Sequence, residues 1–234
     1  MKLTRASHRV LALAAAALLT ASCSSSGASS SGASSSGASS SGASSTAGGP
    51  TLLITSSDGF KVIVSLVSAA KSATADPNNP SPPGHTRLVL RLNEHNVQTD
   101  RPAPFLDLSR TLVLLVNAKS LPGITMNKGP FNNFRLSPDC EAWGATNAPR
   151  DSSMSGWMGV PDTSNGNNER DPALCQLGLS TVIDNFELPS TIPAGGDLTQ
   201  DLRSDTLPES LPLTVFKLAE ATGKSPYTPV IPLK

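Results

Sequence analysis

Beyond residue 50, hydrophobic and polar residues alternate over several stretches with the period of two that is typical of β-strands. In residues 86–93, leucines at every second position alternate with Arg87 and Arg91, so the leucines share one face of a predicted strand. Residues 60–67 are rich in β-branched side chains, and residues 111–116 form a continuous apolar run compatible with a buried strand. Further candidate strands are 52–55, 131–136, 174–179, 198–202, 213–218 and 228–231.

One of these stretches also fits a helix. Phe60, Ile63, Val64 and Val67 follow a spacing of 3.6 residues that continues into residues 69–75. A helix over this stretch therefore stays open as the alternative to a strand.

Proline and glycine limit the fold class. Of the 20 prolines, 19 lie in residues 51–234, where they leave little room for long helices. Short strands separated by Pro, Gly, Asn and Asp clusters favour a two-sheet sandwich over a barrel or an α/β fold. The pattern predicts an all-β sandwich of about seven to nine short strands.

The first 22 residues have the layout of a secretory signal peptide. Lys2, Arg5 and Arg9 precede the apolar run 10–19. A permanent transmembrane anchor is the weaker interpretation, because spanning a bilayer takes a helix of about 20 apolar residues.

Residues 19–23 read LTASC, and this stretch resembles the lipobox of bacterial lipoproteins, although Thr20 stands where that family prefers leucine. The resemblance implies cleavage before Cys23 and lipidation of its thiol with a diacylglyceryl group and palmitate-type acyl chains. It also implies attachment of the exported protein to a cell membrane or outer membrane. A cysteine that happens to follow an ordinary cleavage site is the alternative.

A low-complexity spacer follows the cysteine. The pentad SSSGA repeats four times from Ser24, and the spacer ends at Pro50. Its side chains offer too little apolar area to offset the ordering entropy, so residues 23–50 are expected to be a disordered tether with a root-mean-square span of roughly 30 Å. The folded domain is then residues 51–234. Within it, residues 84–105 combine a strand, Asn96 and a polar turn that contains proline, and they resemble a segment of immunoglobulin-like domains in bacterial lipoproteins. This resemblance implies an immunoglobulin-like sandwich.

Two further cysteines, Cys140 and Cys175, are expected to pair in an exported chain. Such a bridge would stabilise the fold by roughly 3 to 4 kcal/mol. Two buried free thiols are the alternative, and no metal site is predicted because two cysteines without a neighbouring histidine fall short of four zinc ligands.

The sequence offers no catalytic, cofactor-binding or metal-binding motif. His85 and His95 fit exposed edge or loop positions. Residues 153–156 lack the leading glycine of a nucleophile elbow, and residues 162–171 place glycine fifth, where a calcium loop needs it sixth. Nucleic-acid binding is not expected either, because removing three basic residues with the signal peptide leaves 15 basic against 18 acidic ones.

Trp143 and Trp157 both fall between the paired cysteines, together with Met154 and Met158. They either pack the segment between the two cysteines, which we call the excursion, onto the sandwich or form a contact surface for a partner. Tryptophan is enriched in such contact surfaces. The sequence therefore favours a noncatalytic, membrane-anchored extracytoplasmic module that binds an envelope protein or glycan. The alternative is a small envelope-polymer hydrolase with an unrecognised pair of carboxylates.

Overall fold

The computed structural model describes residues 49–56, 58–128, 136–148, 156–162, 169–182, 190–222 and 227–234. The predicted signal peptide (1–22), Cys23 and residues 24–48 of the predicted tether lie outside the described residues. So do residues 131–135 of one candidate strand, Ser153, Met154 and residues 163–168 of the calcium-like loop.

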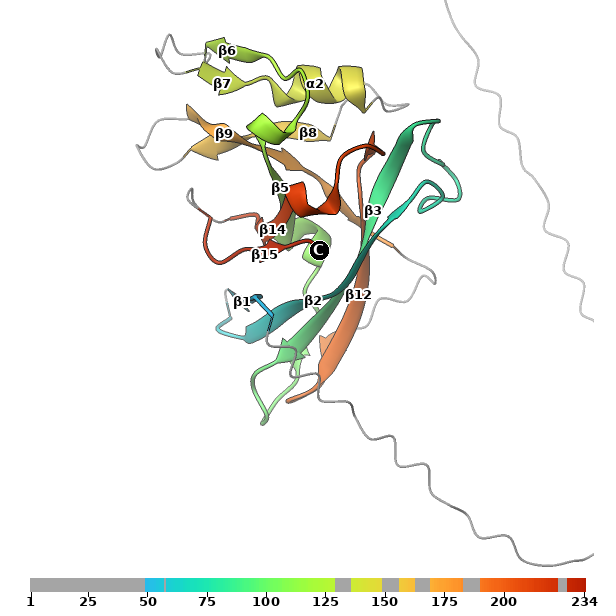
Figure 1. Ribbon diagram of the computed structural model, residues 1–234. Coiled ribbons are helices and arrows are strands. Elements are labelled where there is room, and N and C mark those ends of the chain that lie inside the picture. The colour runs from blue at the N-terminus through green and yellow to red at the C-terminus, as the bar shows by residue number, and fades with distance from the viewer. Residues whose placement is uncertain are drawn as a thin grey trace, which may run out of the picture. The chain divides into compact units, whose positions relative to one another are not determined.

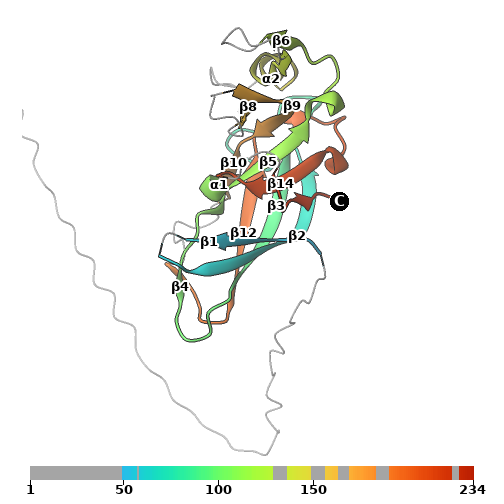
Figure 2. The ribbon, with the colours of Figure 1, turned by 90° about the vertical axis from the view of Figure 1, so that its left-hand side faces the viewer.

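Of the described residues, 51% lie in strands and 12% in helices, and the fold is an all-β sandwich, as predicted. All strand pairs in the described part of the chain are antiparallel. A six-stranded and a five-stranded sheet form the two layers (Figures 1 and 2). The described residues contain 15 strands, more than the seven to nine expected, because several have only two or three residues.

The first sheet has the order β1-β2-β3-β12-β10, and the short strand β13 pairs with the beginning of β3. Its strands are β1 (Thr51–Thr55), β2 (Lys61–Ser72), β3 (His85–Asn96), β12 (Asp197–Ser204), β10 (Leu179–Thr181) and β13 (Leu207–Pro208).

The second sheet has the order β15-β14-β5-β9-β8. Its strands are β15 (Ile231–Pro232), β14 (Phe216–Glu220), β5 (Leu112–Asn117), β9 (Glu169–Leu177) and β8 (Trp157–Asp162).

Two small ribbons and four short helices make up the rest of the described elements. The ribbon of β6 (Met126–Lys128) and β7 (Leu136–Pro138) lies with helix α2 (Cys140–Asn147) at one end of the sandwich, and β4 lies toward the other end (Figure 2). The remaining elements are β4 (Ala103–Pro104) with its partner β11 (Thr191–Ile192), helix α1 (Leu108–Thr111), and the 3-10 helices η1 (Ala118–Ser120) and η2 (Leu213–Val215).

The main core follows the alternation seen in the sequence. Leu88, Leu90 and Leu92 of β3 are fully buried. Arg91 lies on the opposite, outer face, where its guanidinium donates two hydrogen bonds to the carboxylate of Asp201 at 2.9 and 2.7 Å. Arg87 departs from the pattern: it is buried and donates to the backbone carbonyls of Ser204 in β12 and of Asn79 in the loop before β3.

The stretch that also fitted a helix is strand β2. Val62 and Val64 are buried at every second position, but a β-bulge shifts the register between Leu66 and Ser68. Beyond the bulge, Ala69 packs against the main core. The apparent helical spacing combined apolar residues from both faces of the strand, because Val64 is buried, Ile63 is half-buried and Val67 is exposed.

The excursion between the two cysteines contributes a helix and two strands to the fold. Its described residues form α2, β8 and β9, and β9 lies between β5 and β8 in the second sheet. The disulfide between Cys140 and Cys175 is confirmed, with the two Cα atoms 5.7 Å apart. It fastens the start of α2 to a strand of the second sheet.

Candidate functional site

The outer face of the second sheet carries a second group of apolar side chains, separate from the main core. In β5, Leu112, Leu114 and Val116 join the main core, whereas Val113 and Leu115 belong to the outer group. This explains the continuous apolar run in the sequence, because both faces of β5 are covered. The outer group consists of Leu115, Val160 and Ala219, with Val113, Leu174, Tyr227 and Val230 packed against them.

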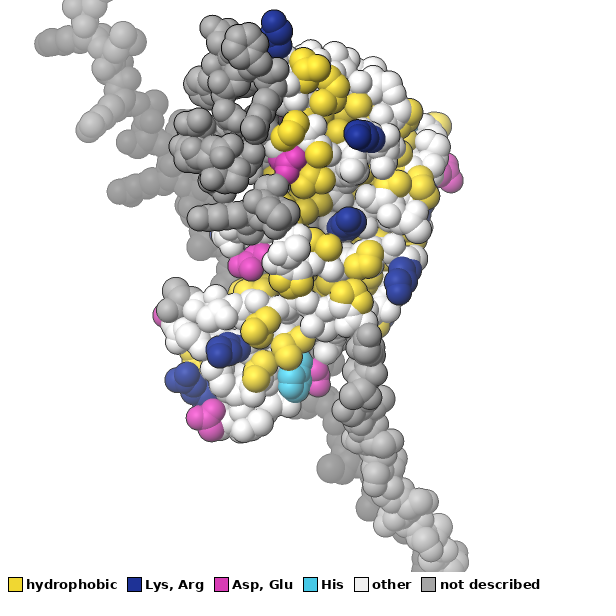
Figure 3. Space-filling model, turned by 60° about the vertical axis from the view of Figure 1, so that its left-hand side comes forward, with side chains coloured by type: hydrophobic (Ala, Val, Ile, Leu, Met, Phe, Trp, Pro, Cys, Tyr) yellow, Lys and Arg dark blue, Asp and Glu magenta, His cyan; other side chains and the backbone are white. Residues whose placement is uncertain are grey.

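A hollow of about 290 Å³ opens on this face, and we call it the outer hollow. Leu115, which is 3% exposed, belongs to the central strand beneath it. On the side of the molecule turned forward in Figure 3, apolar side chains reach the surface in several groups, and Lys and Arg side chains are set singly between them. The outer hollow is lined by Leu115, Asn117, Asp171, Ala173, Leu174, Val215, Lys217, Tyr227 and Val230.

One wall of the outer hollow is a bulge in β9. Gly159 of β8 pairs with Cys175, but Pro161 pairs with Arg170, so residues 171–174 stand opposite Val160 alone. The Asp171 carboxylate accepts a hydrogen bond of 2.8 Å from the backbone N–H of Ala173, across Pro172. Bulges redirect side chains beside binding sites, and this one makes Ala173 and Leu174 a wall of the outer hollow.

The opposite wall comes from the chain just before β15, through Tyr227 and Val230. Partial burial and the negative charge of Asp171 raise the pKa of the Tyr227 phenol above its ordinary value of 10.0. The phenol therefore stays neutral at physiological pH and keeps its O–H donor. Lys217 of β14 is exposed, and among the described residues that line the outer hollow it is the one with a cationic side chain.

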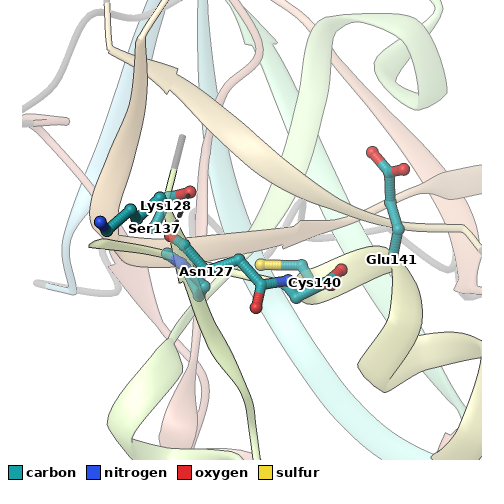
Figure 4. A pocket seen from close by; sticks show the side chains of 7 residues that line it. Asn127, Lys128, Ser137, Cys140 and Glu141 are labelled. Atoms are coloured by element: carbon teal, nitrogen blue, oxygen red, sulfur yellow. Dashed lines mark hydrogen bonds between the residues drawn. The ribbon is translucent and has the colours of Figure 1, made fainter. Parts of the chain in front are cut away.

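A second, polar hollow of about 260 Å³ lies where the β6–β7 ribbon meets the start of α2. It is lined by two carboxylates, Asp139 and Glu141, the arrangement that a hydrolase would need. However, Asp139 caps α2: one oxygen accepts from the N–H of Ala142 at 3.1 Å, and the other accepts from the Asn127 amide at 2.5 Å. Figure 4 shows Glu141 pointing away from Asn127, Lys128 and Ser137. Asp139 therefore serves the helix end, and Glu141 points away from the ribbon residues that line the hollow.

The two tryptophans lie in the main core, as the packing interpretation expects. Trp143 is 4% exposed and Trp157 is fully buried. Their rings meet edge to face with centroids 4.8 Å apart, and each indole N–H donates to a backbone carbonyl, of Pro122 and Thr206 respectively. A partner contact at either indole stays an untested prediction. Because both side chains are buried, such a contact would require the excursion to move away from the main core.

Gly144 makes the tryptophan packing close. A Cβ atom on this residue of α2 would lie 2.6 Å from the Cβ of Trp157. A glycine is needed here because the helix backbone rests directly on the side chain of Trp157.

The histidines are held by local hydrogen bonds. Both ring nitrogens of His85 lie 2.9 Å from backbone carbonyls, those of Pro83 and Asn147. His95 contacts the Asp197 carboxylate at 3.2 Å on the outer face of the first sheet. Both are partly buried strand residues, so the expectation of exposed edge or loop positions was only partly right.

Glu94 is a buried acid that the sequence analysis did not single out. It is fully buried, and the Gln200 amide donates both to its carboxylate and to the carbonyl of Leu106, the latter at 2.6 Å. Its second oxygen has no hydrogen-bond partner among the described residues. Burial raises the pKa of Glu94 to about 7, against the opposing effect of the Gln200 hydrogen bond. The signal in the sequence was its position two residues after Leu92, on the leucine face of β3.

Within the described ranges, no group of three or more His, Cys, Asp or Glu side chains is arranged to hold a metal ion. In the same part of the chain, no helix has the length and apolar character needed to cross a membrane. No family model, curated protein sequence or solved structure matches this chain. The interpretation of the site therefore rests on the geometry of the chain itself.

Proposed function

We propose that the chain is a noncatalytic binding module of the cell envelope, tethered to the extracytoplasmic side of a membrane by a lipid on Cys23. The observation that supports a binding role is the outer hollow, an apolar depression with a few polar groups at its rim. Small-molecule sites combine these features and often include a side chain with a shifted pKa. Here that side chain is Tyr227, whose pKa is raised by partial burial and by the charge of Asp171.

The tether and its anchor are supported by the order of the N-terminal segments. A charged start, a short apolar run and a cysteine are followed by a spacer of Ser, Gly and Ala. A spacer with a root-mean-square span of roughly 30 Å would hold a binding domain away from the lipid surface. A ligand in the envelope, either a protein or a glycan, would then be within its reach.

Attachment is tested by labelling cells with a palmitate analogue and separating membrane from soluble protein. The parent chain should carry the label, and Cys23→Ala should lose the label and leave the membrane fraction. Ser24→Ala is the matched control and should keep both. A Cys23→Ala chain that remains in carbonate-washed membranes would show that the anchor is not this lipid.

Binding is tested with the Cys23→Ala chain as bait in an envelope extract. Ala173 is exposed on the wall of the outer hollow, so Ala173→Phe should fill the hollow without disturbing the core. Ala145→Phe, on the exposed side of α2, is the matched control. A ligand retained equally by both variants would contradict binding at the outer hollow.

A further inference from the structure

We infer that the outer hollow binds a small amphiphile with an aliphatic tail and an anionic head group. The inference rests on the proposed binding role and names the class of ligand for that site. It combines the shape and lining of the outer hollow with the position of Lys217, the cationic side chain among its described lining residues.

The tail is matched by the aliphatic lining. Leu115 lies on the central strand beneath the outer hollow, and Leu174 and Val230 belong to opposite walls. A volume of about 290 Å³ takes about ten groups of the size of a water molecule, at about 30 Å³ each. An acyl chain about as long as that of octanoate would fill this volume.

The head group is matched by the charges at the rim. Lys217 lies on β14 and Asp171 on β9, with β5 between them. An anion would be attracted by the exposed ammonium of Lys217 and repelled by the Asp171 carboxylate. The anionic head is therefore placed at the β14 side of the outer hollow, with the tail running across Leu115 toward β9.

This arrangement predicts how affinity changes with the ligand. Each methylene buried in the outer hollow should raise affinity about fourfold, so octanoate should bind about 15 times more tightly than hexanoate. The gain should stop once the tail outgrows the outer hollow. The ion pair with Lys217 is exposed, so it should contribute no more than about fivefold.

The test uses the full chain carrying Cys23→Ala, prepared without detergent, and titrated with hexanoate, octanoate and 1-octanol by calorimetry and NMR. Octanoate should bind saturably, with shifts confined to residues of the outer hollow. Lys217→Met should weaken octanoate by up to about fivefold and leave 1-octanol unchanged. Lys61→Met, at an exposed lysine on the first sheet, should alter neither. Ala173→Phe should abolish binding of both.

Several results would overturn the inference: no saturable binding of octanoate, equal binding by the Ala173→Phe chain, or a preference for octylammonium over octanoate. These outcomes are independent of the attachment experiment, because the titrated chain carries no lipid. They are also separate from the extract experiment. A protein or glycan captured through the outer hollow would support the proposed binding role and would refute an anionic amphiphile as the ligand.

Discussion

Glu94 should make the stability of this domain fall as the pH rises through the neutral range. The unfolded chain loses the Glu94 proton near its ordinary pKa of 4.5, whereas the folded chain keeps it up to about 7. Between these values the folded state binds more protons, so the free energy of unfolding decreases with increasing pH. This difference between the folded and unfolded pKa of Glu94 corresponds to a loss of about 3 kcal/mol in the free energy of unfolding, at about 1.4 kcal/mol for each unit of pKa.

The perturbation is Glu94→Gln, which keeps the shape of the side chain and removes its charge. In the folded protein, glutamine replaces a carboxyl group that is already neutral at acidic pH, so the variant should resemble the parent below about pH 4.5. At about pH 8 the parent must hold a buried carboxylate with one oxygen lacking a described partner, and the variant should be more stable by about 3 kcal/mol.

The assay is urea unfolding of both chains at steps between about pH 4 and pH 8. The difference between the two free energies isolates Glu94, because every other titrating group is common to both chains. Glu209→Gln, an exposed glutamate, controls for the loss of one negative charge. If the difference between parent and Glu94→Gln stayed constant across this range, the description of Glu94 as a buried, neutral acid would be wrong.

Three further predictions concern packing, the disulfide and the outer hollow. Gly144→Ala should lower the free energy of unfolding by about 1 to 3 kcal/mol, because the added Cβ would press on the Trp157 side chain. This cost should exceed the gain of about 1 kcal/mol that alanine brings to a helix. A variant that is more stable than the parent in urea unfolding would contradict this packing. Replacing Cys140 and Cys175 by alanine should cost about 2 to 4 kcal/mol, and an unchanged thermal midpoint would contradict the stabilising role of the bridge. Tyr227 is the chain's single tyrosine, so its ionisation can be followed by absorbance. Its pKa should lie above 10.0 and should fall in Asp171→Asn. An unchanged pKa in that variant would exclude the influence of Asp171.

The parts of the fold that depend on local patterns could be predicted from the sequence. The leucine alternation of β3 identified its core face, and the apolar run of β5 indicated a buried strand. The disulfide followed from a count of cysteines. Strand ends were less well predicted: residues 213–215 form η2 before β14 begins, and β15 begins at Ile231.

The features that could not be predicted from the sequence depend on residues far apart in the chain. Helix α2 was missed because its glycine disfavours a helix in isolation, and only Trp157, in the following strand, explains the glycine. The outer hollow joins a bulge near Asp171 to a segment at Tyr227, and neither has a recognisable motif. Long-range packing of this kind leaves no periodicity in the sequence.

The position of the outer hollow on β5 determines which variants can test it. Leu115 is 3% exposed and stands between Leu114 and Val116, which belong to the main core. Truncating such a side chain would cost about 2 to 5 kcal/mol, so a loss of binding in Leu115→Ala could not be separated from a loss of folding. Lys217 and Ala173 are exposed, and substitutions at such positions usually change stability by no more than about 0.5 kcal/mol. A change in affinity at these two positions, with an unchanged unfolding midpoint, therefore reports on the ligand and not on the stability of the sheet beneath it.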